Sequence, residues 1–292
     1  MDENKTVNIS LSKALLNAID KQAEVEFRNR SDLIREAVRT YITSKGGMNT
    51  NHKPTKTEHD RLKNGLNFSS FKEEPTILLS CAFRPQPNSV EDIFNGDSEV
   101  VGIMENPPRF RKMGWDLQTL DRAKPVAGEY LEVTNGKRKL LRLYRDGQHT
   151  FAAGIDFFGH GVNRETNSRD NLNLLSIAEC ISNFVVFSRQ ISDKLNDKSG
   201  AMIFTIVISN PNRESLKLHA YDGISTEEVG ILNLEWAEHN VIVVNPDTMS
   251  DMKIAYQIYA ELCYFFGIRT DQFWYVNKVK QEIDKEAFIR QG

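Results

Sequence analysis

Three short polar side chains occupy every second position of the segment "TVNISLS" near the start of the chain. Thr6, Asn8 and Ser10 share one face of the strand that this alternation predicts, because successive side chains point to opposite faces of a sheet. Each can make hydrogen bonds without carrying a charge, so the face is suited to recognising polar groups. The aliphatic residues between them predict an opposite face that is buried.

Two amphipathic helices are predicted to follow this strand. Apolar residues recur at helical spacing after Ser12 in "KALLNAIDKQAEV" and after Ser31 in "SDLIREAVRTYITS". The two serines are the expected N-caps, and Asp32 lies favourably in the first turn of the second helix. Residues 1–46 are therefore predicted to form a strand, a helix, a turn and a second helix.

A single strand in so small a unit needs a partner. If two copies pair their strands antiparallel, Val7, Ile9 and Leu11 of both chains face four helices. The polar residues of both chains then form the outer face of a two-stranded ribbon. The sequence thus predicts an intertwined homodimer through residues 6–43, and a higher oligomer remains open.

This pattern resembles the ribbon-helix-helix family of DNA-binding proteins, of the Arc, MetJ and CopG type, over about residues 5–43. The resemblance implies that the partner is double-stranded DNA and that Thr6, Asn8 and Ser10 contact base edges in the major groove. It also implies that the start of the second helix and nearby basic residues contact phosphates. These predicted phosphate contacts are Lys5, Arg28, Arg30, Ser31 and Asp32.

The charge of this unit is low for a DNA-binding module. Residues 1–46 hold eight basic and seven acidic residues, a net charge of +1, and the three outward ribbon residues carry none. Because phosphate neutralisation supplies much of the affinity for DNA, we expect modest affinity per dimer. A unit used only for dimerisation is the alternative.

The bulk composition indicates an ordinary globular protein. The 292 residues are 40% hydrophobic and 26% charged with a net charge of −3, which suggests two domains and gives no global sign of a nucleic-acid or membrane binder. Neither a signal peptide nor a membrane span is expected, so the predicted location is cytoplasmic, at the nucleoid. Cys81, Cys180 and Cys263 form no metal-binding spacing, and no cofactor is expected.

The rest of the chain is divided into a connector and a larger domain. Residues 47–75 are polar with little periodicity and are predicted to be a flexible linker. Residues 76–292 are predicted to form an α+β or mixed α/β domain that senses a ligand, binds a partner or oligomerises. Its expected strands lie at 76–83, 129–133, 138–144, 149–155, 201–209, 215–221, 228–234 and 240–244, and its expected helices at 171–195, 248–268 and 272–289.

An antiparallel meander is the clearest local prediction in this domain. The dipeptides Asn135-Gly136 and Asp146-Gly147 are strong hairpin signals between three extended runs. Catalytic motifs are absent, and we expect no enzyme activity. Asp156 and His160 in "GIDFFGHGVN" are the most enzyme-like pair, with His149 as the only nearby second histidine, but a glycine-rich turn explains the segment equally well.

A basic segment stands out at residues 106–145, which carry ten basic and four acidic residues. Aromatic residues are interleaved among the charges. The interpretations are a pocket for a small anionic ligand, a second nucleic-acid surface, or a solvated hairpin. The residues assigned to the first two are Arg109, Arg111, Lys112, Lys137, Arg138, Lys139 and Arg142.

The function that these patterns favour is a sequence-specific transcriptional regulator, with a repressor as the more common kind. Two alternatives stay open. One is an enzyme or effector that the N-terminal unit delivers to DNA, and the other is a plasmid-partition or antitoxin-type DNA-binding protein.

Overall fold

The computed structural model divides the chain into two compact units, Met1–Asn51 and His52–Gly292, and each is described by itself. In the first unit the structure describes Lys13, Leu16, Asn17, Ile19–Lys21, Arg30 and Ile34. In the second it describes residues 55–66, 71, 74–85, 99–112, 114–119, 121–135, 138–159, 171–195, 200–212, 215–221, 226–232, 234–243 and 246–290.

One antiparallel sheet organises the second unit, with the strand order β10-β7-β1-β5-β4-β3-β2. Its strands are β1 (Thr76–Arg84), β2 (Lys124–Val126), β3 (Tyr130–Asn135), β4 (Lys139–Tyr144), β5 (His149–Gly154), β7 (Ala201–Ser209) and β10 (Trp236–Val243). The predicted meander is confirmed as β3, β4 and β5. The turn between β4 and β5 places Gly147 at φ +81°, a conformation that favours glycine.

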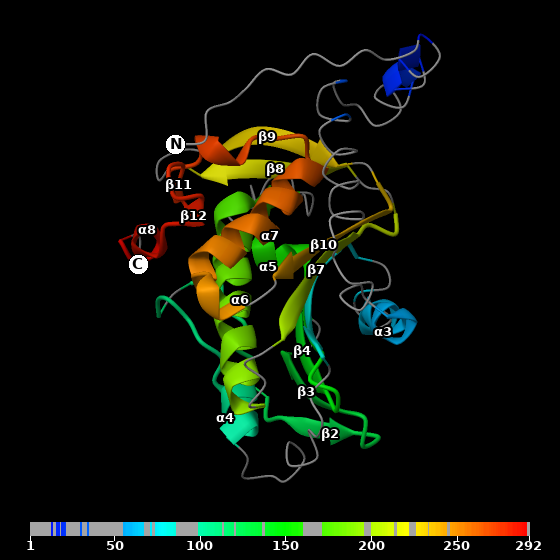
Figure 1. Cartoon of the computed structure of the whole chain (residues 1–292), viewed down its shortest axis with the longest axis vertical. Coiled ribbons are helices and arrows are strands. Elements are labelled where there is room, and N and C mark those ends of the chain that lie inside the picture. Colours follow the sequence, from blue (N-terminus) through cyan, green and yellow to red (C-terminus); the bar gives the residue numbers. More distant parts are fainter. Residues whose placement is uncertain are drawn as a thin grey trace. The chain divides into compact units, whose positions relative to one another are not determined.

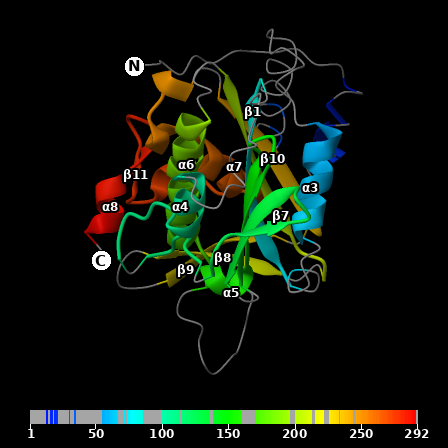
Figure 2. The same ribbon diagram turned by 90° about the horizontal axis from the view of Figure 1, so that it is seen from below.

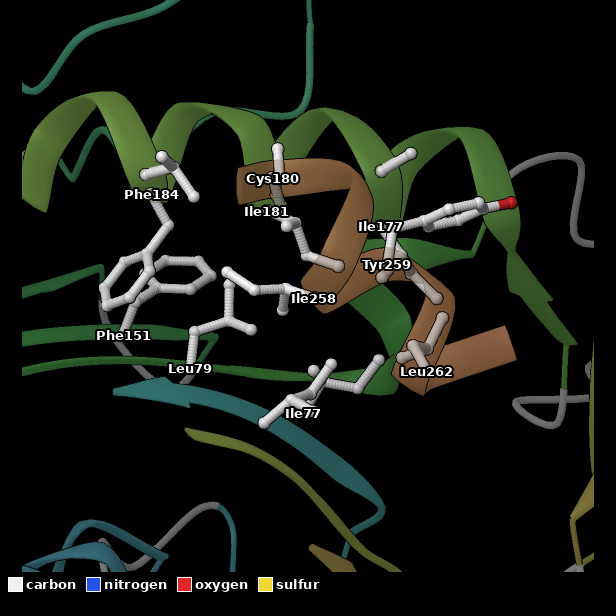
Figure 3. Packing of buried hydrophobic residues seen from close by; sticks show 14 of the residues in the cluster. Ile77, Leu79, Phe151, Ile177, Cys180, Ile181, Phe184, Ile258, Tyr259 and Leu262 are labelled. Carbon is white, nitrogen blue, oxygen red and sulfur yellow. The ribbon is translucent and has the colours of Figure 1, made fainter. Parts of the chain in front are cut away.

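The two faces of this sheet pack against different elements, because side chains alternate along each strand. On β1, Ile77 and Leu79 belong to the larger core cluster, whereas Leu78 belongs to a smaller one with Leu62. Figure 3 shows Ile77 and Leu79 below the helices that carry Ile181 and Ile258. The main core therefore lies between one face of the sheet and two long helices.

These two helices are α6 (Leu174–Lys194) and α7 (Asp251–Phe265), which lie side by side over that face (Figures 1 and 2). Both were predicted, and both begin at a side-chain cap: Asn173 accepts a hydrogen bond from the amide of Leu175, and Ser250 from that of Lys253. Helix α6 is long and apolar enough to cross a membrane, but 83% of that stretch is buried within the protein, which is also typical of a core helix.

Helix α3 (Lys56–Leu66) covers the opposite face of the sheet (Figures 1 and 2). The prediction of a linker at 47–75 is therefore wrong over this stretch. The helix is attached by Leu62, which packs in the smaller core cluster, and by ion pairs: the guanidinium of Arg84 on β1 donates to both carboxylate oxygens of Glu58, and Arg61 pairs with Asp146 at 2.5 Å. Its sequence is mostly polar, so apolar periodicity gave no clear sign of it.

The remaining elements pack at the ends and edges of the unit. A second sheet has the order β6-β8-β9, with β6 parallel to β8 and β9 antiparallel to it. These elements are β6 (Asn171–Asn173), β8 (Leu216–Tyr221), β9 (Thr226–Leu232), α4 (Glu99–Glu105), α5 (Ile155–Phe158), η3 (Pro246–Thr248), η4 (Thr270–Gln272), β11 (Val276–Asn277), β12 (Glu282–Ile283) and α8 (Lys285–Ile289).

The helix predicted at 272–289 is wrong. The structure has the small hairpin β11–β12 there, and only α8 is helical. Local side-chain hydrogen bonds compete with a continuous helix: Asn277 accepts from the amides of Val279 and Lys280, and Asp284 accepts from the amide of Glu286. The helix accordingly starts only after Asp284.

Candidate nucleic-acid interface

The described residues of the first unit are helical, and all of them except Arg30 lie within the two predicted helices. Lys13, Leu16, Asn17, Ile19, Asp20 and Lys21 are helical, as are Arg30 and Ile34. The exposure of their side chains follows the predicted amphipathic pattern: Leu16, Ile19 and Ile34 are partly buried, whereas the side chains of Lys13, Asn17, Lys21 and Arg30 are exposed. A single chain thus covers these three apolar side chains only in part.

A bidentate ion pair joins the two helical segments. Arg30 donates from Nε to Asp20 Oδ1 and from Nη2 to Asp20 Oδ2, both at 2.5 Å. These hydrogen bonds and the carboxylate charge raise the pKa of Arg30 above its ordinary value. The pair is exposed, so it contributes little to stability. Its importance is electrostatic, because a phosphate bound by Arg30 must share the guanidinium with Asp20.

Arg30, which precedes the predicted cap Ser31 in the sequence, is helical. Ser31 and Asp32 lie outside the described residues, so the cap and the phosphate contact at the start of the second helix stay predictions.

Most of the residues predicted to contact DNA lie outside the described part of the chain. These are Lys5, Thr6, Asn8, Ser10, Arg28, Ser31 and Asp32. Their roles stay predictions. The same holds for the apolar ribbon face of Val7, Ile9 and Leu11, and so for the intertwined dimer.

Three of the seven residues assigned to the basic segment form ion pairs within the second unit. Arg111 binds Glu179 of α6 with Nη2–Oε2 at 2.8 Å and Nε–Oε1 at 3.0 Å. Lys139 lies 3.4 Å from a carboxylate oxygen of Asp116. Arg142 pairs with Glu132 at 2.7 Å. All three basic side chains in these pairs are at least nine-tenths buried.

These pairs show that the basic side chains of this segment do not all belong to one exposed surface. Arg111, Lys139 and Arg142 hold the fold together, because each is enclosed with a carboxylate. Arg109, Lys112 and Arg138 are exposed, and Arg109 donates to Gln118 at 3.2 Å. Lys137 lies outside the described residues. An anionic ligand is left with a much smaller set of basic side chains than the sequence suggested.

The structure encloses His149 completely. Its ring lies among Phe83, Phe184 and Phe187, Nδ1 lies 3.0 Å from the carbonyl oxygen of Gly147, and Nε2 lies 2.7 Å from the hydroxyl of Ser188. In the neutral ring Nδ1 donates to that carbonyl and Nε2 is an acceptor. The hydroxyl of Ser188 lies within hydrogen-bond distance of both Nε2 and the carbonyl oxygen of Phe184, and its single proton can be donated to one of them at a time. Burial lowers the pKa of His149 to about 4, so the ring is uncharged at neutral pH.

Folded stability is expected to fall as the pH is lowered from about 6.5 to about 4. In this range the unfolded chain binds a proton at position 149 that the folded chain excludes. A shift of this size corresponds to roughly 3 kcal/mol of unfolding free energy once the pH is below both values. Urea denaturation at a series of pH values measures it.

The variant His149→Gln should flatten this pH dependence, because glutamine does not titrate. His219→Gln serves as a matched control at a less enclosed histidine whose pKa burial also lowers, and it should flatten the profile less. Equal pH profiles for the parent protein and His149→Gln would contradict the assignment.

The other candidate reactive groups offer no assembled site among the described residues. Asp156 is exposed on α5, and His160 lies outside the described residues. The three cysteines are buried, and burial raises the pKa of each thiol, for Cys263 to about 12. Within the described ranges, no group of three or more potential metal ligands comes together.

The alternating strand residues in the sequence, followed by two helical segments of amphipathic exposure, define the first unit as a strand–helix–helix module. Residues 5–45 match the family model described as ribbon-helix-helix protein, copG family. The segment is therefore a CopG-type ribbon-helix-helix domain, and members of this family are in general DNA-binding transcription regulators. No curated relative and no solved structure matches the chain.

Proposed function

We propose that this protein is a sequence-specific DNA-binding transcriptional regulator that acts as a homodimer. Repression of transcription is the direction of regulation that we propose. The observation that carries the proposal is the family match at residues 5–45, the same segment in which residue spacing alone predicts a paired ribbon. Such a role places the protein at the nucleoid in the cytoplasm.

Recognition in this proposal separates base reading from phosphate binding. The ribbon of two chains enters the major groove, which is wide enough for two strands. Asn8 pairs with adenine through its amide, and the hydroxyls of Thr6 and Ser10 serve donors or acceptors. The N-terminus of the second helix, with Arg30 beside it, contacts a phosphate.

Electrostatics argues that one ribbon alone binds weakly. Residues 1–46 have a net charge of only +1, and Asp20 already neutralises Arg30. We therefore propose that the second unit increases the occupancy of the DNA site. It would do so by joining copies of the protein, by binding a partner or by sensing a ligand. Linking weak modules multiplies their affinity without new base contacts.

No reaction is assigned to the second unit in this proposal. Among the candidates from the sequence, His149 is enclosed by aromatic rings and has its hydrogen bonds made by Gly147 and Ser188. A group in that position cannot reach a substrate without opening the core. The enclosure of His149 therefore supports a non-catalytic role for this histidine.

Asn8→Ala is expected to weaken binding to the specific DNA site while the dimer persists. A bidentate contact between an amide and adenine contributes about 1–3 kcal/mol, so loss from both chains should reduce affinity by roughly 30-fold or more. Genome-wide mapping of bound sites identifies the DNA, and a mobility-shift titration at fixed salt then measures the change.

Asn17→Ala is the matched control, since it makes the same substitution at an exposed helical asparagine. It should leave both affinity and specificity unchanged. If Asn8→Ala retained full affinity for the specific site, the base-reading role of the ribbon would be wrong.

A further inference from the structure

The edges of the two larger sheets in the second unit are unlike one another. Edge strands present unpaired backbone groups, and proteins that avoid edge pairing shorten such strands, place lysine or proline in them, or interrupt their register. Strand β2 uses three of these devices: it has 3 residues, and they include Lys124 and Pro125, both exposed. Strand β9 has a register shift against β8, between Leu218 and His219.

Strand β10 has none of these features. It is 8 residues long, contains neither proline nor lysine, and pairs with β7 in an unbroken register from Trp236 to Val243. Within the described ranges, β7 is the strand that pairs with it, so β10 forms an edge of the seven-stranded sheet.

The charged side chains of β10 are turned toward its own unit. Glu238 lies 3.3 Å from His59 of α3 on one face, and His239 lies 3.3 Å from Glu261 of α7 on the other. Ala237 and Val243 are buried, and the side chains between them are partly buried. The strand therefore has a regular backbone edge and no charge pattern that repels an identical strand.

We propose that β10 pairs antiparallel with β10 of a second copy, so that the two sheets become continuous. The inference rests on the proposed function in one respect, because ribbon pairing supplies the second copy. Once the ribbons hold two chains together, contact between their second units is intramolecular, with an effective concentration in roughly the millimolar range. A weak edge contact then forms without any increase in protein concentration.

Two-fold symmetry restricts the register of this strand pairing and the placement of the helices on the joined sheet. An isologous contact pairs the same surface of both chains. When identical strands pair antiparallel about a two-fold axis, one residue of β10 must lie opposite its own copy, and helices α6 and α7 of both chains stay on the same side of the joined sheet. The proposed ribbon pairing has two-fold symmetry of its own.

A scan of single cysteines along β10 in the full-length protein tests this geometry. The variants are His239→Cys, Asn240→Cys, Val241→Cys and Ile242→Cys. The residue opposite its own copy should form an intermolecular disulfide under mild oxidation about ten-fold faster than the residue two positions away, since bridged Cα atoms must lie within about 7 Å. The native cysteines give a low background, because all three are buried.

Lys124→Cys on the opposite edge strand is the control and should cross-link no faster than the parent protein. The size of the parent protein, measured by light scattering, separates this inference from the proposed function. A dimer whose β10 cysteines all fail to cross-link would overturn the edge pairing and leave the regulator intact. Cross-linking at one position, in a protein whose DNA binding ignores Asn8→Ala, would support the pairing and overturn the base-reading role.

Discussion

Ile9→Asp is expected to dissociate the dimer and abolish DNA binding. Ile9 is predicted to point from the ribbon into the space between the four helices of two chains. A carboxylate placed there has no partner, and burying an unpaired charge costs several kcal/mol, which is comparable with the whole stability of a small domain. Since the outward residues of two chains are needed to fill the groove, affinity for the specific site should fall at least about 100-fold.

The neighbouring change Asn8→Asp is the matched control. It introduces the same side chain one position away, on the opposite face of the same strand. We expect this variant to remain a dimer by analytical ultracentrifugation and to lose DNA binding through repulsion of phosphates. If Ile9→Asp formed a stable dimer, or if both variants dissociated alike, the assignment of the two ribbon faces would be wrong.

Local signals in the sequence were sufficient to predict most of the second unit's sheet. The turns at Asn135-Gly136 and Asp146-Gly147 fixed the order of β3, β4 and β5, because such dipeptides favour two-residue hairpins. Long apolar runs between polar caps predicted α6 and α7. Strand order across the whole sheet could not be predicted, because β1 pairs with β5 and β7, which lie far along the chain.

The errors in the fold share a physical cause. Helix α3 is mostly polar in sequence, with Leu62 packed in the smaller core cluster, and it is also attached through the ion pairs of Glu58 and Arg61. In the C-terminal segment a continuous helix was predicted at 272–289, but the side chain of Asn277 forms a turn by accepting from the amides of Val279 and Lys280. Charge pairing and side-chain-to-backbone bonds both depend on partners that a periodicity analysis does not weigh.

The candidate site likewise contains a part that the sequence predicted and a part that it did not. The ribbon-helix-helix segment could be predicted because its strand and helices are adjacent in the sequence, and the family match supports it. The exposed charge of the basic segment could not be predicted, because one acidic partner is remote and two others lie within the segment: Glu179 lies 68 residues beyond Arg111, whereas Asp116 and Glu132 pair with Lys139 and Arg142. A net charge counted along the sequence does not distinguish exposed basic side chains from those enclosed in ion pairs.

Glu179→Met is expected to destabilise the second unit by about 3–5 kcal/mol, the usual cost of removing one partner from a buried ion pair. The side chain of Glu179 is 1% exposed and that of Arg111 is 9% exposed, so the guanidinium would stay enclosed without its carboxylate. Methionine keeps helix propensity and similar bulk in α6, which limits the change to the lost charge. Urea denaturation measures the free energy of unfolding.

The double variant Arg111→Met/Glu179→Met should recover most of that loss, because it removes both charges and leaves apolar side chains in an apolar site. Arg290→Met, in the exposed pair with Asp284, should cost about 1 kcal/mol or less. If the double variant were as unstable as Glu179→Met, the loss would come from packing and not from an unpaired charge. The contrast decides whether the basic segment serves the fold through its ion pairs.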